Sequence, residues 1–271
     1  MNDYKLAHEY ETVNLYRRGA AAKIELNRPE TRNAWNTQFS VDLLGAIRAT
    51  GDDPDVRAIL VTGAGKAFSS GADLRENLGD AAEGGRPDVY RRLTESYHPI
   101  ITGIRQMPKP VVSAVHGAAA GIGLSLALAG DLVVAAESAF FLLAFVNIGL
   151  VPDGGSSVLV PSRVGFTRAA ELALLGERLP ASQALEWGLI NRVWPDDEFA
   201  ARADELLARL AAGPTRSYAG TKRQLNNWLY DRMPVQLEFE ARIQQEAAGS
   251  ADFIEGVIAF SEKRAPQFTG S

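Results

Sequence analysis

The chain has 271 residues, of which 46% are hydrophobic, and its formal net charge at pH 7 is −5. A chain of this composition can bury a sizeable core, which argues against intrinsic disorder, and its acidic balance argues against a general nucleic-acid binder. It contains no cysteine, which excludes disulfides and thiolate metal sites and fits a reducing, cytoplasmic location.

The first half of the chain alternates expected strands and helices. Apolar runs, helical periodicity and Gly/Pro breaks define these elements. In chain order, we predict strands at Thr12–Arg17, Ala21–Leu26 and Val56–Thr62, a helix at Thr37–Thr50, loops at Lys66–Leu74 and Glu76–Pro87, and a helix at Asp88–Gln106. The second of these loops, rich in Gly, Ala and acidic residues, is expected to be a mobile surface loop.

The stretch Lys109–Asp131 is the most informative part of the chain. An apolar run, Val111–Val115, is followed by small residues at Gly117–Gly123 and by helix-forming apolar residues at Leu124–Ala129. This order predicts a buried strand, a tight turn and a helix N-terminus, so a transmembrane helix is not expected. The first N–H groups of a helix lack internal partners, so such a turn can stabilise an oxyanion.

The pattern changes after residue 195. Before it we expect a strand at Leu132–Ala135, a loop at Ile148–Ser157, helices at Thr167–Leu175 and Ala181–Trp187, and a strand at Ile190–Val193. After it, Gly and Pro break a purely helical pattern into helices at Asp196–Ala212, Pro214–Leu229, Pro234–Ala248 and Asp252–Lys263. We therefore predict two parts, a mixed α/β core (1–195) and a helical C-terminal region (196–271).

A second loop of small residues, Phe68–Leu74, also follows a predicted strand. Alone it is an ordinary turn. Together with the Gly117–Gly123 turn it offers a pair of free backbone N–H groups, as a two-donor oxyanion hole requires.

The chain resembles the crotonase (enoyl-CoA hydratase/isomerase) superfamily over nearly its whole length. Five motifs carry the resemblance: N-R-P-x-x-x-N-A at 27–34, S-G-A-D-L at 70–74, K-P-V followed by H-G-A-A-A-G at 109–121, G-L-V-P-D-G-G-S at 149–156, and E-K-R-A-P-Q-F at 262–268. The resemblance implies an α/β fold, a spiral of ββα turns with a C-terminal helical trimerisation region, and a homotrimer or a dimer of trimers. It also implies an acyl-CoA thioester substrate that reacts through its enolate, with the N–H groups of Ala72 and Ile122 as oxyanion donors.

The acid–base residues separate the branches of this family. Hydratases of the family use two glutamates, and this chain has Ser125 and Phe145 at those positions. Neither side chain can replace a carboxylate base, so the usual hydratase mechanism is not expected.

Asp153 is the remaining candidate acid or base. Its segment, Pro152-Asp153-Gly154, is also a common turn sequence. The surrounding motif resembles the epoxyphenylacetyl-CoA isomerase branch and related dienoyl- or enoyl-CoA isomerases, in which an aspartate here shuttles one proton. Isomerisation needs only one base, and general base catalysis contributes about 10²–10⁴-fold. Apolar neighbours are expected to raise the pKa of Asp153.

His98 leaves a second mechanism open. In the related aroyl-CoA dehalogenases, a histidine at this spacing assists hydrolysis of an ester formed on the aspartate that matches Asp153. Many relatives carry a histidine here without such a role, so a structural or pocket-lining role is the alternative. With three histidines in the chain and no supporting carboxylate cluster, we expect no metal site.

The CoA portion of the substrate requires basic and backbone contacts because it carries phosphates. Loop residues, and by resemblance two residues contributed by a neighbouring subunit, supply the candidates. They are Arg28, Arg32, Ala34, Lys66, Ser70, Ala72, Phe260 and Lys263. No separate cofactor is expected, since CoA is part of the substrate, and neither nucleic acid nor membrane is an expected partner.

The sequence thus predicts a cytoplasmic acyl-CoA isomerase in which Asp153 moves a proton. The alternatives are an enoyl-CoA hydratase with an unusual acid–base set, a hydrolase or dehalogenase using Asp153 with His98, and a non-catalytic CoA- or RNA-binding relative.

Overall fold

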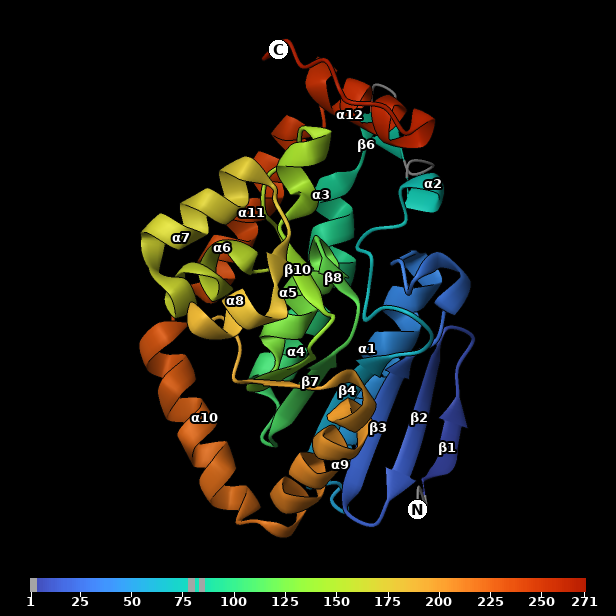
Figure 1. Ribbon diagram of the computed structural model, residues 1–271, viewed down its shortest axis with the longest axis vertical. Coiled ribbons are helices and arrows are strands. Elements are labelled where there is room, and N and C mark those ends of the chain that lie inside the picture. The colour runs from blue at the N-terminus through green and yellow to red at the C-terminus, as the bar shows by residue number, and fades with distance from the viewer. Residues whose placement is uncertain (1–3, 78–80, 83–85) are drawn as a thin grey trace.

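The computed structural model describes residues 4–77, 81–82 and 86–271, and it has the predicted mixed α/β architecture (Figure 1). The large sheet contains, in spatial order, β1 (Lys5–Glu9), β2 (Val13–Arg18), β3 (Ala21–Leu26), β4 (Ala58–Gly63), β7 (Val111–Val115), β9 (Leu132–Ala136) and β12 (Arg192–Trp194). β1, β2 and β3 pair antiparallel, and the strands from β3 to β12 pair parallel.

Two smaller sheets complete the strands. β10 (Phe140–Leu142) lies between β8 (Ala118–Ala120), to which it is parallel, and β11 (Leu179–Pro180), to which it is antiparallel. β5 (Ala81–Ala82) pairs with β6 (Arg86–Pro87). The rest of the predicted mobile loop at Glu76–Pro87, residues 78–80 and 83–85, lies outside the described residues.

The helices lie on both sides of the large sheet and at its ends (Figure 1). They are α1 (Thr37–Asp52), α2 (Leu74–Asn77), α3 (Val89–Arg92), α4 (His98–Gln106), α5 (Ile122–Ala129), α6 (Ser156–Leu159), α7 (Pro161–Leu175), α8 (Ala181–Glu186), α9 (Asp196–Ala212), α10 (Thr215–Leu229), α11 (Met233–Ala247) and α12 (Ala251–Glu262). Two short 3₁₀ helices, η1 (Pro29–Thr31) and η3 (Ala144–Ile148), and a π-helical turn, η2 (Leu93–Tyr97), complete the secondary structure.

The central parallel strands are buried on both faces. In β4, Ile59 and Val61 join the main core, which includes residues of α1, α4 and α5, while Ala58 and Leu60 join a second core that α9 covers. Because both faces are covered, these strands are continuous apolar runs without a polar side, which is why their existence was predictable.

Several predicted boundaries were wrong for local reasons. The helix predicted at Asp88–Gln106 is divided into α3, the π turn η2 and α4. The π turn directly precedes the Pro99 turn of α4, and proline has no N–H to donate to the carbonyl of Glu95. The segment Gly117–Gly123 is not only a turn, because β8 forms within it.

Near the end of the core, the predicted strand Ile190–Val193 is displaced to Arg192–Trp194, where it pairs with β9. The helix predicted at Thr167–Leu175 begins earlier, at Pro161, and Gly165 with φ of +77° interrupts it. β1 was not predicted, because all its side chains are exposed and no apolar alternation marks it.

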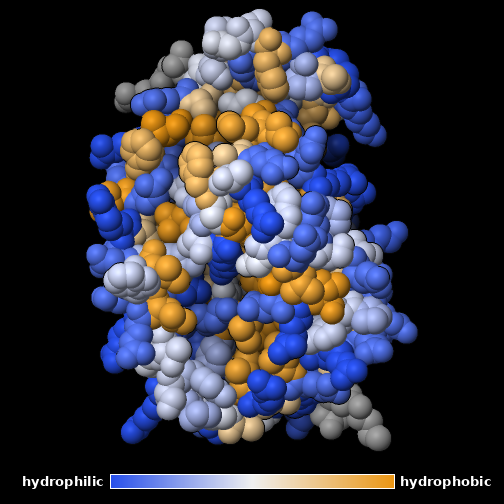
Figure 2. All heavy atoms as spheres, turned by 60° about the vertical axis from the view of Figure 1, so that its left-hand side comes forward, coloured by the Kyte–Doolittle hydropathy of each residue, from blue (hydrophilic) through white to orange (hydrophobic). Residues whose placement is uncertain are grey.

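The four C-terminal helices form the predicted helical region, and they pack against the core of their own chain. Met233, Leu237 and Ala241 of α11 belong to the main core. Figure 2, in which the side of α7 and α10 is turned forward, shows orange patches separated by hydrophilic side chains. Large apolar side chains exposed on these two helices are Phe166, Leu174, Leu175, Leu225, Trp228 and Leu229.

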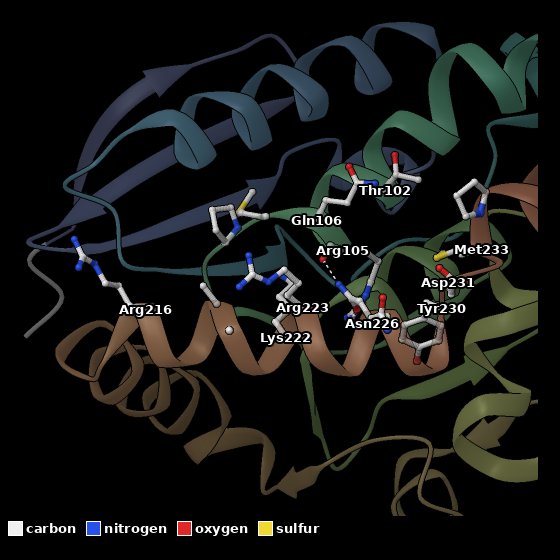
Figure 3. Close-up of a pocket in the computed structure, with 16 residues that line it drawn as sticks. Thr102, Arg105, Gln106, Arg216, Lys222, Arg223, Asn226, Tyr230, Asp231 and Met233 are labelled. Atoms are coloured by element: carbon white, nitrogen blue, oxygen red, sulfur yellow. Dashed lines mark hydrogen bonds between the residues drawn. The ribbon is translucent and has the colours of Figure 1, made fainter.

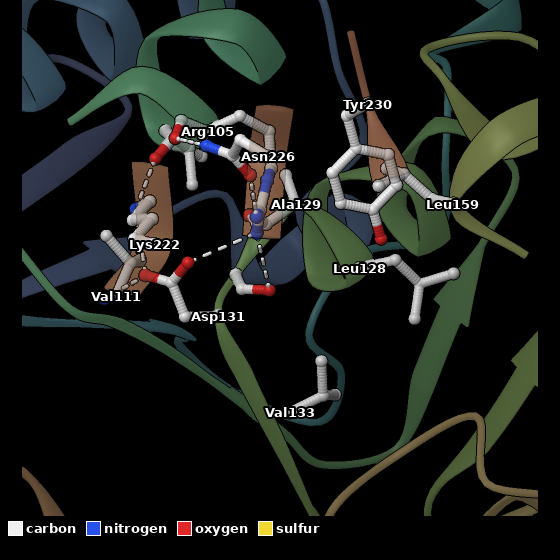
Figure 4. A network of polar contacts seen from close by, with 12 residues as sticks. Arg105, Val111, Leu128, Ala129, Asp131, Val133, Leu159, Lys222, Asn226 and Tyr230 are labelled. Carbon is white, nitrogen blue, oxygen red and sulfur yellow. Dashed lines mark hydrogen bonds and ion pairs between the residues drawn. The ribbon is translucent and has the colours of Figure 1, made fainter. Parts of the chain in front are cut away.

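A buried ionic network joins α10 to the core (Figure 4). The Asp131 carboxylate accepts hydrogen bonds from Lys222 Nζ (2.8 Å), Arg105 Nη1 (3.2 Å) and the Val111 N–H (2.9 Å). Asn226 of α10 donates from Nδ2 to the Arg105 carbonyl (2.6 Å) and accepts from the Arg105 guanidinium. Burial lowers the pKa of Lys222 to about 8, so the charged form of this lysine depends on Asp131 beside it.

We predict that Asp131→Asn destabilises the protein by about 3 kcal/mol, because it leaves two buried cations without their counter-charge. Chemical denaturation at pH 7 measures this. The control is Glu198→Gln, which removes an exposed i,i+4 ion pair with Arg202 and should change stability by about 0.5 kcal/mol or less. Equal effects of the two substitutions would contradict the prediction.

Candidate active site

The small-residue loop Ser69–Asp73 lies between two other segments and is paired with both. Ser69 forms a parallel bridge with Ala119 of β8, and Ala72 forms one with Trp35. The Ala120 N–H donates to the Ser69 carbonyl (3.0 Å), and the Trp35 N–H donates to the Gly71 carbonyl (2.8 Å). The loop is therefore held from both sides by backbone hydrogen bonds.

Gly71 allows this close approach. Its φ is +97°, and a Cβ placed there would lie 2.9 Å from the Ala120 carbonyl oxygen. Both the backbone conformation and the space require glycine. The result is that Gly71 packs directly against the Ala120–Gly121 segment that leads from β8 into α5.

The N–H groups of Ala72 and Ile122 are both available for a ligand. In the parallel bridge, the Trp35 N–H donates to the Gly71 carbonyl and the Trp35 carbonyl accepts from the Asp73 N–H. The N–H of Ala72, between them, therefore points away from Trp35. Ile122 is the first residue of α5, where an N–H has no partner inside the helix. No hydrogen bond in the described ranges uses either N–H.

Asp153 lies in the loop before α6 and is 4% exposed. Its main-chain carbonyl accepts hydrogen bonds from Ser125 Oγ (2.8 Å) and Ser156 Oγ (2.8 Å). A Cβ on the next residue, Gly154 (φ +60°), would lie 2.3 Å from Ile122 Cδ1. These contacts place the Asp153 loop against the first turn of α5.

Asp153 and Ala72 line the same small cavity, of about 40 Å³. The lining is mostly apolar, with a few polar side chains. The lining residues are Ala72, Leu74, Pro87, Val89, Arg92, Leu93, Tyr97, Leu150, Asp153, Gln244 and Phe253. The structure thus brings one predicted oxyanion donor and the predicted acid together, whereas Ile122 borders the Asp153 loop without lining this cavity.

The two carboxylate oxygens of Asp153 have different environments. Oδ2 accepts a hydrogen bond from Gln244 Nε2 (2.9 Å). Oδ1 is buried and has no partner among the described residues, as is also true of the Tyr97 hydroxyl on the same cavity. Buried polar atoms normally have partners, so these two oxygens are candidates for contact with a ligand.

The pKa of Asp153 is raised to about 8, chiefly by burial and also by the negative charge of nearby Glu240, while the Gln244 hydrogen bond and Arg92 act in the opposite direction. Burial also raises the pKa of Tyr97. At neutral pH, Asp153 is therefore mostly a neutral acid with a readily removed proton, the property expected of a proton-transfer group.

The other candidate acid–base residues have different surroundings. Ser125 is fully buried and its hydroxyl is used by the Asp153 carbonyl. Phe145 is buried in η3. His98 does not line the Asp153 cavity; its charged neighbour is Glu238, and burial lowers its pKa to about 4. The structure does not bring His98 into the cavity with Asp153.

The N-R-P-x-x-x-N-A motif has a structural explanation. Arg32 and Asn33 both have positive φ, 58° and 56°. The Asn33 side chain stabilises this turn, because its Oδ1 accepts from the Arg28 N–H (2.8 Å) and its Nδ2 donates to the carbonyls of Ala64 (3.0 Å) and Ala67 (2.8 Å). The asparagine thus fixes the loop beside Ser69–Asp73.

The residues predicted to bind CoA fall into two groups. Arg28 is buried, and its Nη1 donates to Asp73 (3.1 Å) and to the Ala34 carbonyl (2.6 Å), so it joins the two loops. Ala34 is buried beside it. Ala72 is half-buried, and the others are exposed: Arg32, Lys66 and Ser70 on the loops, and Phe260 and Lys263 at the end of α12.

Three residues of this region were missed by the sequence analysis. Tyr97, Glu240 and Gln244 belong to no quoted motif, and the two from α11 come from the region predicted only to assemble subunits. The π turn that ends at Tyr97 is a signal that could have singled it out, because such turns occur often at functional sites.

A larger cavity, of about 640 Å³, lies between the end of α4 and α10 (Figure 3). Arg105, Lys222 and Asn226 of the ionic network line it, together with Tyr230 and Met233. None of the predicted catalytic residues lines this larger cavity.

Within the same described ranges, the structure contains no cluster of three or more His, Asp or Glu side chains suited to a metal ion. No described helix is both long and apolar enough to cross a membrane.

Comparison with known proteins identifies related sequences and structures. Residues 17–271 match the family model described as enoyl-CoA hydratase/isomerase. A probable enoyl-CoA hydratase from Rhodobacter capsulatus is 44% identical over 96% of this chain and 99% of its own. The 1,2-epoxyphenylacetyl-CoA isomerase of Escherichia coli is 42% identical over 91% of this chain and 94% of its own.

A solved structure of an enoyl-CoA hydratase from Mycobacterium avium subsp. paratuberculosis superposes with a TM-score of 0.87 and 38% identity. The alignment covers 96% of this chain and all of the other. The crotonase-type fold predicted from the motifs is thereby confirmed.

We predict that Asp153→Asn becomes more stable relative to the wild type as pH rises from 4 to 8. The pKa of Asp153 is raised from 3.8 to about 8, so in this window the folded wild type retains a proton that the unfolded chain has released. Its stability therefore falls as pH rises, whereas asparagine does not ionise. Urea denaturation at several pH values measures the difference, and a difference that is constant with pH would contradict a buried, neutral Asp153.

Proposed function

This chain belongs to the enoyl-CoA hydratase/isomerase family, and within that family we propose that it is an acyl-CoA isomerase with Asp153 as its proton carrier. The observation that carries the proposal is the pairing of one unpartnered carboxyl oxygen, on Asp153, with the Ala72 loop around a single cavity.

In this proposal, the ionised form of Asp153, a minority at pH 7 and about half near pH 8, removes a proton from the α-carbon of a 3-enoyl thioester. The electrons move onto the thioester oxygen, and the N–H groups of Ala72 and Ile122 stabilise the resulting dienolate. Asp153 then returns the same proton to the γ-carbon, and the double bond moves into conjugation. With an aromatic-derived acyl group, the same acid would assist a ring rearrangement.

The absence of the two hydratase glutamates supports an isomerase. Ser125 donates to the Asp153 carbonyl and Phe145 packs in η3, so neither supplies a base. Two other buried carboxylates nearby do not line the cavity. Glu240 accepts hydrogen bonds from the N–H groups of Gly155 (2.8 Å) and Ser157 (3.1 Å), and Asp73 is paired with Arg28 (3.1 Å). One available carboxyl suits a reaction that needs one base. The printed names of the two relatives divide between hydratase and isomerase, so the site residues decide our choice.

We extend the proposal to CoA binding and assembly. The exposed Arg32, Lys66 and Lys263 would contact phosphates, and Phe260 would contribute apolar contact from a neighbouring subunit. A homotrimer, or a dimer of trimers, would cover exposed apolar side chains such as Phe166 and Trp228. A cytoplasmic location remains part of the proposal.

We predict that Asp153→Asn lowers isomerisation of a 3-enoyl-CoA by at least about 10²-fold, because the proton carrier is removed. The purified protein is offered a 3-enoyl-CoA, a 2-enoyl-CoA and an aromatic acyl-CoA in deuterated water, and deuterium in each product is followed by NMR. Isomerase activity that survives the substitution would overturn the proposal.

The same assay separates the alternatives. Water addition to the 2-enoyl-CoA that persists in Asp153→Asn would indicate a hydratase that does not use Asp153. Hydrolysis that leaves ¹⁸O in Asp153 would indicate the nucleophilic route with His98. Binding of every acyl-CoA without turnover would indicate a non-catalytic relative.

We also predict that Ile122→Pro lowers kcat by about 10²–10³-fold, the effect of losing one oxyanion donor. Proline is well tolerated at the first position of a helix, where Ile122 lies, so the substitution removes the N–H while keeping α5. Ile122→Val, which retains the N–H, is the control and should keep most of the activity. Thermal unfolding of both variants verifies the fold. If a folded Ile122→Pro is as active as the wild type, the Ile122 N–H is not an oxyanion donor.

A further inference from the structure

Helix α11 contacts the Asp153 loop through two side chains one helical turn apart. Glu240 binds the N–H groups of Gly155 and Ser157, and Gln244 binds Val151 and Asp153. Glu240 and Gln244 are 3% and 1% exposed, so neither contact competes with bulk water. The loop that carries the proposed acid is thus held by the C-terminal helical region of its own chain.

The orientation of the Gln244 amide is determined by its two partners. Its Oε1 accepts a hydrogen bond from the Val151 N–H (2.9 Å), a group that can only donate. Its Nε2 therefore faces Asp153 Oδ2, 2.9 Å away, and donates to it. The reversed amide would place two donors together at Val151 and two acceptors together at Asp153.

This contact distinguishes the two oxygens of Asp153. Oδ2 accepts from Gln244, so the proton of the neutral acid is on Oδ1, the oxygen without a partner in the described chain. Asp153 lines the cavity beside Ala72, and the proton is thus on the oxygen that no described side chain or backbone group occupies.

The charged and titratable groups around Asp153 come from three elements. Glu240 of α11 raises the pKa of Asp153 and Arg92 of α3 lowers it, while the Gln244 hydrogen bond favours the carboxylate. Tyr97 of η2 lines the same cavity. Glu240 and Gln244 therefore influence the same acid in opposite directions from one helix.

We propose that Gln244 is the positioning residue for proton transfer by Asp153: its amide holds Oδ2 so that Oδ1 alone exchanges a proton with the substrate. This inference rests on the proposed function and adds a residue to it.

The first test is Gln244→Met, which keeps the length of the side chain and removes the amide. The pH at half-maximum of the rising limb of kcat/KM is expected to move up by about one unit, because the carboxylate loses a hydrogen bond. The maximal kcat should also fall about tenfold, because the carboxyl is no longer fixed in one orientation. The control is Gln236→Met on the same helix, which removes a hydrogen bond to Ser157 Oγ and should leave the pH profile unchanged.

The second variant, Glu240→Gln, should move the same limb to lower pH, because it removes a negative charge close to Asp153. Its thermal unfolding is measured in parallel, since the new amide must face a backbone N–H. If the Gln244→Met limb stays in place, or moves in the same direction as that of Glu240→Gln, the inference is wrong.

Titration of ¹³C-labelled aspartates without substrate separates this inference from the proposed function. A pKa of Asp153 that rises in Gln244→Met supports the contact directly. An unchanged pKa overturns the inference even if the enzyme is an isomerase. If the turnover rate is unchanged in both Gln244→Met and Asp153→Asn, the proposed function is wrong instead.

Discussion

The proposed site depends on one constraint, the pairing of the loop Ser69–Asp73 with a backbone segment on each side. The loop bonds to the 33–35 segment and to β8, and Gly71 makes the second contact possible. A backbone N–H can serve as an oxyanion donor only if its position is fixed before the substrate arrives. The buried Asn33 side chain and the Arg28–Asp73 ion pair fix the neighbouring loop, so the donors do not rely on a mobile surface turn.

Asp153 illustrates the cost of placing an acid in an apolar site. Burial destabilises its charged form, so in the folded protein the pKa of this carboxyl is about 8 and the acid is mostly neutral below that pH. The same burial makes the proton transferable near neutral pH, which an exposed aspartate does not achieve. Stability and reactivity thus depend on the same feature, as is common at functional sites.

Local sequence signals predicted those parts of the molecule that local physics determines. The buried strands, the loops at Ala72 and Ile122 and the turn at Asp153 each have a composition that marks them. Gln244 could not be found in this way, because its partner is 91 residues away in the chain and a glutamine inside a helix has no special signature. Tyr97 lies in a segment whose periodicity is helical. Its position is marked only by the π turn before Pro99, which the structure reveals. The strands β8 and β10 are three residues long and exist because they pair with each other, which no local window can indicate.

The origin of Gln244 and Glu240 in α11 also has a consequence for protein synthesis. Both backbone donors and Asp153 are encoded before residue 154, but the side chains that hold Asp153 emerge from the ribosome about 90 residues later. On the proposed mechanism, a nascent or prematurely terminated chain would carry an acid without its amide partner. Full activity toward thioesters would then require that α11 has been synthesised and has packed against the Asp153 loop.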